Sequence, residues 1–537
     1  MKKYFWLALV VFLAAGLRFY HLGLNPPSIY WEEAAIGYDA YSILKTGKDF
    51  HGNRLPLVAF ESFGDYKPSL YFYTTVPSVA LFGLNAFAVR APSALFGTLT
   101  VLLIYFLVQE LFHSRSGVAP LATRNPKLVA LLASLLLATS PWHLQLSRAG
   151  FEANLGLFLV VLGAWLFLKG TSHARYLWLA VLTWGLSFYA YHADRVFIPL
   201  LGLVWGLWFF TSLVKKPKAV LAAAGLFILI VLPVSLRLNS PQVKLRFQQT
   251  SAFASLAPII KSNQLIAEDG GGLVARLVHH RFWHYGQIFL KNYSDHYSGE
   301  FLFLSGDTNP RHSIQLVGGL YLIQLPLILL GAAWLFRRER SAFWLLTLWL
   351  ILAPVPAGLT LATPHALRSL PLLIPLQIFS AYGVVSLFKN RRWLASLATL
   401  FLILEFGRYL YLCHTVYPRL YSDQWQYGYR QAVEFVSSRQ VDYDHIYFTR
   451  ELGRPSIYYW FYTKTDPQLV QAENDQAAKD QGEFLNFGKI VFGPPPENPP
   501  TGSLIVVGGK DSAPASATLL TTIFDLDSKP VFAIYEI

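Results

Sequence analysis

Two adjacent carboxylates, Glu32 and Glu33, follow shortly after the first apolar stretch of the chain. Acidic residues at the start of a helix complement its dipole, and that is one interpretation of the pair. The other is catalytic, because a general base must lie within hydrogen-bond reach of the proton that it removes. We therefore treat Glu32 and Glu33 as candidate catalytic residues.

Basic residues stand at the ends of several other apolar stretches. Each one alone is typical of an anchor at the membrane surface, although a lysine can also hold a phosphate as a point charge. Ionisable residues at membrane depth are costly and usually face a cavity. The basic residues together with the two carboxylates favour a site that binds an anionic phosphate and removes a proton from a nearby hydroxyl. The candidates for phosphate binding are Lys67, Arg148, Arg368 and His365, and the further candidates are Asp65, Arg90, His192 and Arg195.

Metal, disulfide and nucleotide sites have little support in the sequence. His280 and His284 have the i, i+4 spacing of two metal ligands, but the Glu of the matching motif is missing. An amphipathic helix at the membrane surface is the favoured interpretation of that segment. The single cysteine, Cys413, excludes an intramolecular disulfide and a Cys-based zinc site. Phosphate-binding and dinucleotide-binding glycine motifs are absent. We expect no cofactor, with a divalent metal as the alternative.

The elements that must position these residues are membrane spans. The chain has 537 residues, of which 54% are hydrophobic and 14% are charged, against about 25% charged in soluble proteins. This composition excludes disorder, a coiled coil and a soluble nucleic-acid binder. Runs long enough to cross the bilayer predict about eleven transmembrane helices, near residues 4–23, 87–109, 127–142, 153–169, 175–192, 196–214, 218–236, 315–336, 342–360, 369–388 and 393–413.

The net charge of +13 serves to orient these spans. If the N-terminus is cytoplasmic, every loop assigned to the inside is basic, as the positive-inside rule requires. An odd number of spans then places the C-terminus outside. The long segments 24–86 and 237–314 and the tail after 413 also fall outside. The first contains amphipathic stretches at Ala34–Leu44 and Pro68–Leu81.

The tail, residues 414–537, is predicted to be a small α/β domain. A helical stretch is expected at Gln424–Ser438, and Gly493–Gly502 is expected to be a loop because of its Pro and Gly content. Apolar strands are expected at His445–Phe448, Lys489–Phe492, Ser503–Val507 and Val531–Tyr535.

The motifs and their order resemble those of a bacterial glycosyltransferase family. The family consists of GT-C fold membrane enzymes related to protein O-mannosyltransferases and to the aminoarabinose transferase that modifies lipid A. The resemblance covers roughly residues 1–410, so it implies a GT-C membrane domain over 1–413. It rests on Trp31-Glu32-Glu33, Tyr66-Lys67-Pro68-Ser69-Leu70, Arg90-Ala91-Pro92-Ser93-Ala94-Leu95, Ser147-Arg148 and Pro364-His365-Ala366-Leu367-Arg368.

The resemblance implies transfer of a sugar from a polyprenyl-phosphate donor to a hydroxyl of a protein, lipid A or an envelope glycan outside the cytoplasm. In the family an Asp-Glu pair supplies the base, and Glu32 takes the place of that Asp here. Some relatives have an acid directly before the lysine and use it near a metal. Here Tyr66 holds that position and Asp65 lies one residue earlier. We therefore expect an inverting, metal-independent displacement.

Three alternatives stay open from the sequence. A polyprenyl-linked oligosaccharide transferase or ligase would act on the same side, but the Trp-Trp-Asp signature of oligosaccharyltransferases is absent. A lipid or solute transporter would have broken helices at midplane in two matching halves, whereas these polar residues stand at span ends. An inactive relative is the third, because Glu32 departs from the family's Asp.

Overall fold

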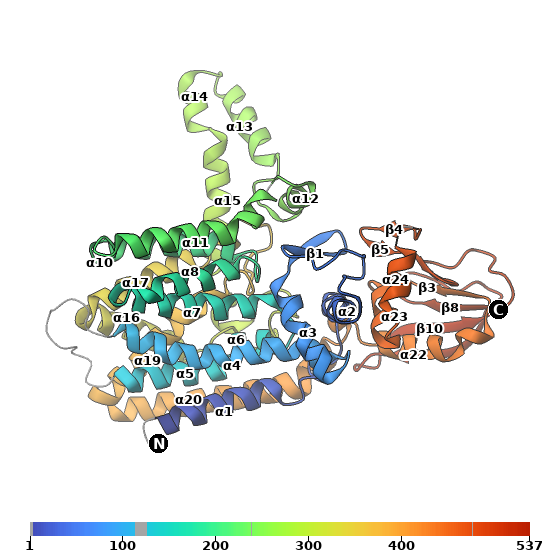
Figure 1. The fold of residues 1–537 in the computed structure, drawn as a ribbon, viewed down its shortest axis with the longest axis horizontal. Coiled ribbons are helices and arrows are strands. Elements are labelled where there is room, and N and C mark those ends of the chain that lie inside the picture. The colour runs from blue at the N-terminus through green and yellow to red at the C-terminus, as the bar shows by residue number, and fades with distance from the viewer. Residues whose placement is uncertain (1–3, 113–125, 238, 475) are drawn as a thin grey trace. The chain divides into compact units, whose positions relative to one another are not determined.

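The computed structural model of the chain describes residues 4–112, 126–237, 239–474 and 476–537 (Figure 1). The chain divides into two compact units. The helical unit comprises 1–17, 96–146 and 153–409, and the mixed unit comprises 18–95, 147–152 and 410–537. The units are interleaved along the chain, so each gathers segments that are far apart in the sequence.

Six helices are long and apolar enough to cross a membrane, or seven if one bent pair is a single span, among the residues that the structure describes. The bent pair is α5 (Pro126–Thr139) and α6 (Pro141–Ser147), which meet at 58°. Each predicted span overlaps a helix, but the count of eleven spans stays a prediction. The other main apolar helices are α1 (Phe5–Phe19), α4 (Ala86–Leu111), α7 (Glu152–Ser172), α8 (Arg175–Ser187), α9 (Asp194–Trp208), α11 (Pro217–Leu236), α16 (Gln324–Arg338), α17 (Arg340–Leu352), α19 (Leu373–Asn390) and α20 (Arg392–Tyr411).

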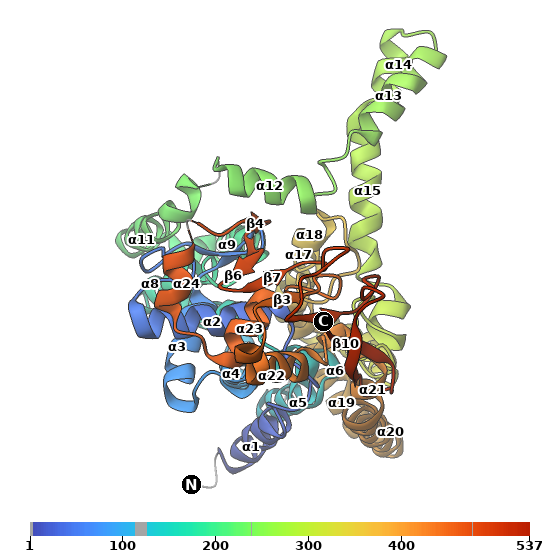
Figure 2. The same ribbon diagram turned by 90° about the vertical axis from the view of Figure 1, so that its right-hand side faces the viewer.

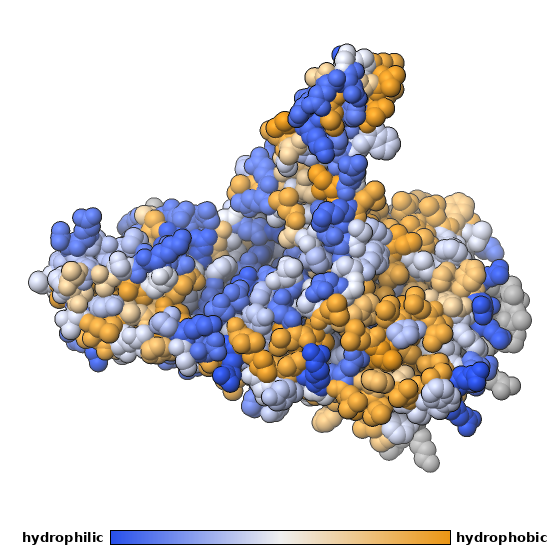
Figure 3. Space-filling model, turned by 180° about the vertical axis from the view of Figure 1, so that it is seen from behind, coloured by the Kyte–Doolittle hydropathy of each residue, from blue (hydrophilic) through white to orange (hydrophobic). Residues whose placement is uncertain are grey.

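The core of the helical unit depends on close backbone contact between α16 and α19. A Cβ atom added at Gly331 would lie 1.9 Å from the carbonyl oxygen of Phe379, and one at Gly383 would lie 2.1 Å from that of Leu327. Small residues permit such contact between membrane helices. The face of the unit seen in Figure 3 carries large apolar areas, and α11 exposes Leu221, Ile228 and Leu229. An apolar interior and an apolar exterior together are what a lipid environment requires.

The predicted loop 237–314 is largely helical. It contains α12 (Pro241–Thr250), α13 (Ala257–Glu268), α14 (Leu273–Val278) and α15 (Arg281–Asp295), followed by a π-helix at Glu300–Leu304. Helices α13 to α15 form an arm that extends away from the helical bundle (Figures 1 and 2). His280 is the N-cap of α15, where its Nδ1 accepts a hydrogen bond from the Phe282 N–H. His284 lies inside the same helix.

The mixed unit begins with α2 (Trp31–Thr46), a hairpin of β1 (Ala59–Ser62) and β2 (Asp65–Pro68), and α3 (Leu70–Phe82). Helices α2 and α3 coincide with the two predicted amphipathic stretches. The hairpin turn has φ values of 52° at Phe63 and 77° at Gly64, the left-handed conformation of a tight two-residue turn. This turn fixes the register that pairs Phe60 with Lys67.

The C-terminal part of the mixed unit is an α/β domain, as predicted. Its six-stranded sheet has the order β6-β7-β3-β8-β10-β9, with β3 parallel to β7 and β8, and β10 antiparallel to its neighbours. The helices are α22 (Tyr429–Arg439), α23 (Pro455–Thr463) and α24 (Pro467–Glu473). The strands of this sheet are β3 (His445–Phe448), β6 (Asn486–Phe487), β7 (Ile490–Phe492), β8 (Ser503–Val507), β9 (Thr518–Phe524) and β10 (Pro530–Glu536), and β4 (Lys479–Asp480) pairs with β5 (Glu483–Phe484).

Candidate active site

Glu33 is fully buried in the mixed unit and its carboxylate is bound from several sides. The Arg90 guanidinium donates from Nε to Oε1 and from Nη2 to Oε2, both at 2.8 Å. The Gly150 N–H donates to Oε1 at 2.7 Å, and the Tyr30 N–H approaches Oε2 at 3.4 Å. A bidentate pair of this kind is both strong and geometrically specific. Glu33 therefore holds the start of α2 in place.

Arg90 extends the same network into the backbone. Its Nη1 donates to the carbonyl oxygens of Leu22 at 3.2 Å and Pro26 at 2.9 Å, and its Nη2 also donates to that of Ser28. The side chain is fully buried. A buried arginine with this many acceptors satisfies the hydrogen-bonding potential of its guanidinium. Arg90 thus fixes the segment that leads into α2.

Glu32 lies next to Glu33 but has a different environment. Successive residues of a helix differ by about 100° in direction, so Glu33 faces inward while Glu32 faces the surface with its side chain 34% exposed. Its Oε1 is 3.0 Å from Lys67 Nζ, and its Oε2 accepts a hydrogen bond from the Tyr30 hydroxyl at 3.4 Å. Of the two carboxylates, Glu32 is the one that solvent reaches.

The β1–β2 hairpin delivers Lys67 to this carboxylate. Residues two apart on a strand share a face, so Asp65 and Lys67 lie together, with Asp65 Oδ2 3.3 Å from Lys67 Nζ. Tyr66 projects from the opposite face. Glu32, Asp65 and Lys67 do not fit a metal site of the kind implied for some relatives. The cation between the Asp65 and Glu32 carboxylates is the Lys67 ammonium.

Arg148 is buried in the mixed unit and contacts backbone carbonyls. Its Nη2 donates to Asn25 O at 2.9 Å, and its Nη1 lies 3.4 Å from Arg18 O. Asn25 in turn donates from Nδ2 to Cys413 O at 3.0 Å. Arg148 is thus connected, through Asn25 of the segment before α2, to the π-helix at Leu412–Val416. Its expected contact with a phosphate stays a prediction.

The other predicted site residues belong to the helical unit, and each unit is described by itself. Arg368 is partly buried and donates from Nη1 to Thr360 Oγ1 at 2.8 Å. Arg195, in the first turn of α9, donates from Nε to Phe188 O at 3.0 Å. His192 lies in the turn just before α9. The phosphate contact of Arg368 and the site roles of the further candidates Arg195 and His192 also stay predictions.

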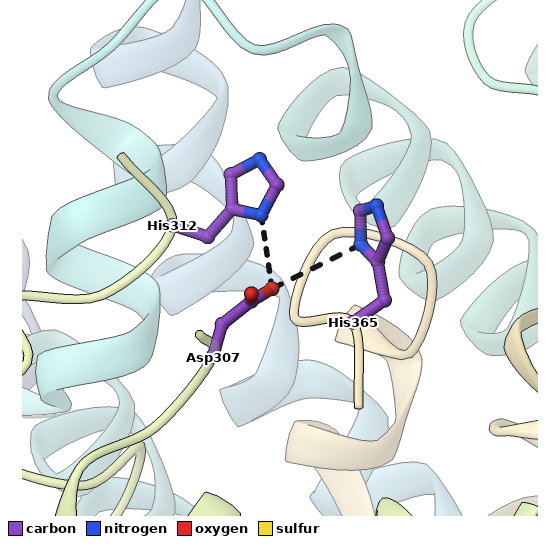
Figure 4. A group of neighbouring side chains, drawn as sticks. All are labelled: Asp307, His312 and His365. Atoms are coloured by element: carbon purple, nitrogen blue, oxygen red, sulfur yellow. Dashed lines mark hydrogen bonds and ion pairs between the residues drawn. The ribbon is translucent and has the colours of Figure 1, made fainter. Parts of the chain in front are cut away.

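His365 forms a cluster with Asp307 and His312 (Figure 4). His312 Nδ1 is 2.9 Å from Asp307 Oδ2, and His365 Nδ1 is 4.0 Å from the same oxygen. The two imidazole rings are 5.0 Å apart. Asp307 and His312 share one loop, whereas His365 lies far along the chain in another. No fixed spacing links the three, so no local pattern signals the cluster.

Burial and charge set the protonation of this cluster. Burial alone would raise the pKa of Asp307, but the charges of His312 and His365 and two hydrogen bonds lower it to about 2. Burial, and then the charges of Arg368 and His312, hold the pKa of His365 well below its ordinary value. At neutral pH the cluster therefore contains an ionised carboxylate and a neutral His365.

Comparison with known proteins agrees with the motifs. The family model of dolichyl-phosphate-mannose-protein mannosyltransferases matches residues 66–236. The putative mannosyltransferase YkcB of Bacillus subtilis (strain 168) is 26% identical over 160 residues, which are 29% of this chain and 20% of that protein. The resemblance to this glycosyltransferase group is confirmed. The chain spans only about a fifth of the length of this curated relative.

One solved structure shows the fold. ArnT from Cupriavidus metallidurans, bound to undecaprenyl phosphate, has a TM-score of 0.52 and 12% sequence identity, with 99% of this chain and 98% of that chain covered. The oligosaccharyltransferase of Archaeoglobus fulgidus, in complex with zinc and sulfate, has a TM-score of 0.49 and 12% identity, with 85% and 61% covered. The likeness to ArnT establishes the helical GT-C membrane fold for this chain.

Proposed function

We propose that this protein is an integral-membrane glycosyltransferase that moves a monosaccharide from a polyprenyl-phosphate donor to an acceptor hydroxyl. The observation that carries the proposal is the contrast between Glu33, locked by Arg90, and Glu32, accessible beside Lys67. The fold of ArnT, which was solved with undecaprenyl phosphate, supports a donor of this class. The family match at 66–236 supports a sugar as the transferred group.

In the proposed reaction Glu32 is the general base. Its carboxylate takes the proton of the acceptor hydroxyl while the hydroxyl oxygen attacks the anomeric carbon of the donor. The bond from that carbon to the phosphate oxygen breaks, and the lipid phosphate leaves with both electrons, so the configuration inverts. Phosphate leaves without prior protonation, and no second carboxylic acid is required, unlike in glycosidases. General-base assistance contributes about 10²–10⁴-fold.

Lys67 links donor binding to the base. Without donor, its ammonium pairs with Glu32 and Asp65. A lipid phosphate competes for the same ammonium, because it carries negative charge and several acceptor oxygens. Once Lys67 turns to the phosphate, the Glu32 carboxylate is available to the acceptor hydroxyl. This exchange of partners orders the reaction, with donor before acceptor, and places a cation at the leaving group.

The finer features of the proposal follow the sequence. Arg148 joins Lys67 as a ligand of the donor phosphate, the sequence also nominates Arg368 and His365 of the helical unit, and Glu33 acts as a positioning residue for the α2 segment. The N-terminus is cytoplasmic, residues 1–413 form the membrane domain with about eleven spans, and residues 414–537 form an extracytoplasmic domain. The acceptor is a protein, lipid A or an envelope glycan, and membrane lipids surround the spans.

The test is complementation of a host that lacks the gene. We expect the deletion strain to accumulate the polyprenyl-phosphate sugar and to lose one envelope glycan or glycolipid, as measured by mass spectrometry. Wild type restores the product, and Glu32→Gln does not, although the variant protein reaches the membrane in normal amounts. Glu451→Gln, which changes an exposed carboxylate of the same unit, restores the product fully. Restoration by Glu32→Gln would contradict the assignment of the base.

A further inference from the structure

We propose that Asp307, His312 and His365 form a binding site for one divalent transition-metal cation of the Zn²⁺ type. The inference is argued from these three side chains and is tested by metal binding instead of glycosyl transfer, although His365 is also one of the proposed phosphate ligands. The three residues lie in two loops of the helical unit, and their side chains converge on one point (Figure 4). Among the described residues they form a group of metal-ligating side chains whose donor atoms all lie within 4.8 Å of one another.

The spacing of the donor atoms fits a cation. A tetrahedral centre with bonds near 2.1 Å holds its ligand atoms about 3.4 Å apart. Asp307 Oδ2 lies 2.9 Å from His312 Nδ1 and 4.0 Å from His365 Nδ1, so the two separations lie on either side of this distance. Small side-chain adjustments would place one ion in contact with all three atoms. His312 must then carry its proton on Nε2 instead of Nδ1.

His365 gives an independent indication of a missing partner. Its Nδ1 is buried and makes no hydrogen bond within the described part of the chain, and its ring points toward Asp307 (Figure 4). A buried polar atom of this kind carries a desolvation cost unless something binds it. A cation between Nδ1 of His365 and the Asp307 carboxylate would bind both.

Surrounding hydrogen bonds hold the ligands in position. The Asp307 carboxylate accepts from the Ala366 N–H at 2.7 Å and from the Asn309 N–H at 2.8 Å. The backbone N–H of His365 donates to His296 Nε2 at 3.0 Å, and His296 Nδ1 is 2.8 Å from Asn292 O. Groups that orient metal ligands in this way are typical of protein metal sites. Both loops are thus fixed before an ion binds.

The donor set selects the class of ion. Two imidazoles and one carboxylate suit Zn²⁺ and similar transition metals, whereas Mg²⁺ and Ca²⁺ prefer oxygen ligands. Three protein ligands leave the fourth tetrahedral position for water or an anionic oxygen, as in catalytic zinc sites. A cavity of about 10 Å³, lined by Asp307, His312, Trp142 and Phe301, adjoins the cluster. It has room for one water molecule.

The experiment is titration of purified full-length protein with Co²⁺, followed by displacement with Zn²⁺. We expect the visible ligand-field absorption of four-coordinate Co²⁺ at one ion per chain, with loss of the signal on addition of Zn²⁺. The variant His312→Ala/His365→Ala should lose the absorption. The variant His280→Ala/His284→Ala removes the helical His pair of α15 and should retain it.

A second variant guards against misfolding of the first. His365→Gln removes one ligand at a position whose Nδ1 has no hydrogen bond among the described residues, so we expect it to fold and to weaken Co²⁺ binding at least tenfold. The proposal fails if wild type shows no such absorption, if the His312/His365 variant retains it, or if only the His280/His284 variant loses it. Unchanged Co²⁺ affinity in His365→Gln would also overturn it.

Discussion

The carboxylate pair of the mixed unit and the Asp307 cluster of the helical unit neutralise negative charge in different ways. Glu33 and Glu32 each have a permanent cation from the chain itself, Arg90 at 2.8 Å and Lys67 at 3.0 Å. Asp307 has two imidazoles, which are cationic only when protonated. The carboxylates of the mixed unit are already neutralised by side chains of the folded chain, whereas the Asp307 cluster can bind a cation from solution. The carboxylate pair can therefore react only if Lys67 exchanges Glu32 for another anion. The Asp307 cluster acts by binding an additional cation.

The largest effect should come from breaking the buried pair of the mixed unit. Arg90→Ala leaves Glu33 as an uncompensated buried charge, and such a change costs about 3–5 kcal/mol. We expect a large fall in thermal stability, measured by the temperature dependence of monodispersity in detergent. Arg90→Lys keeps the charge but loses the two-atom contact, so it should fall between wild type and Arg90→Ala. Unchanged stability in Arg90→Ala would show that the pair does not hold this region together.

Lys67→Met tests the exchangeable pair. Loss of a cation at the leaving group should lower turnover by roughly 10²–10³-fold, as for removal of one preorganised donor in other active sites. Affinity for the polyprenyl-phosphate donor should fall as well, while stability changes little because the contact is partly exposed. The matched control is Lys45→Met, an exposed lysine at the end of α2, which should behave as wild type. Normal turnover in Lys67→Met would remove Lys67 from the mechanism.

The Asp307 cluster should respond to metal in a way that the mixed unit does not. A ligand that binds only the folded state at 100 times its Kd adds about 2.7 kcal/mol to the free energy of unfolding. We expect Zn²⁺ to raise the unfolding temperature of wild type and of Lys67→Met. The His312→Ala/His365→Ala variant should show no such rise. An equal rise in that variant would assign the effect to another site.

Asp39 offers the smallest test, because it is a buried acid of the mixed unit that has no ion pair among the described residues. Its Oδ1 accepts the Phe50 N–H at 3.2 Å. Burial, and then the charge of Asp49, raise its pKa well above the ordinary value. The folded state therefore binds a proton that the unfolded state releases, so stability should fall as pH rises between the two pKa values. Asp39→Asn should flatten this decline in a comparison of unfolding at pH 5 and pH 8, and an unchanged slope would contradict the assignment.

The sequence predicted those features that are local. Strands β3 and β8 have the predicted bounds, because short apolar runs between turn residues leave little choice. Helix α23 was missed because its run of aromatic residues after Pro455 has no helical alternation of polar and apolar positions. Strand β9 was missed because Thr residues interrupt its apolar pattern and much of it is exposed.

In the candidate site, too, the sequence predicts local features but not contacts between distant segments. Glu32 and Glu33 were found as a pair, but only the direction of each side chain on α2 separates the accessible carboxylate from the locked one. Arg90 is one of the further site candidates from the sequence, and its pairing with Glu33 emerges only from the fold. The Asp307 cluster joins two loops that are far apart in sequence, and no periodicity records such a contact. The sequence selects His365 by itself, but its grouping with Asp307 and His312 could not be predicted without the three-dimensional arrangement.

The most direct test of the central claim compares Glu32→Gln and Glu33→Gln in one experiment. Thermal unfolding and glycosyl transfer to the native acceptor are measured on both purified proteins. The account predicts that Glu32→Gln unfolds like wild type but loses transfer by about 10²–10⁴-fold. Glu33→Gln is predicted to lose stability through the broken Arg90 pair. Normal transfer by a stable Glu32→Gln protein would contradict the account.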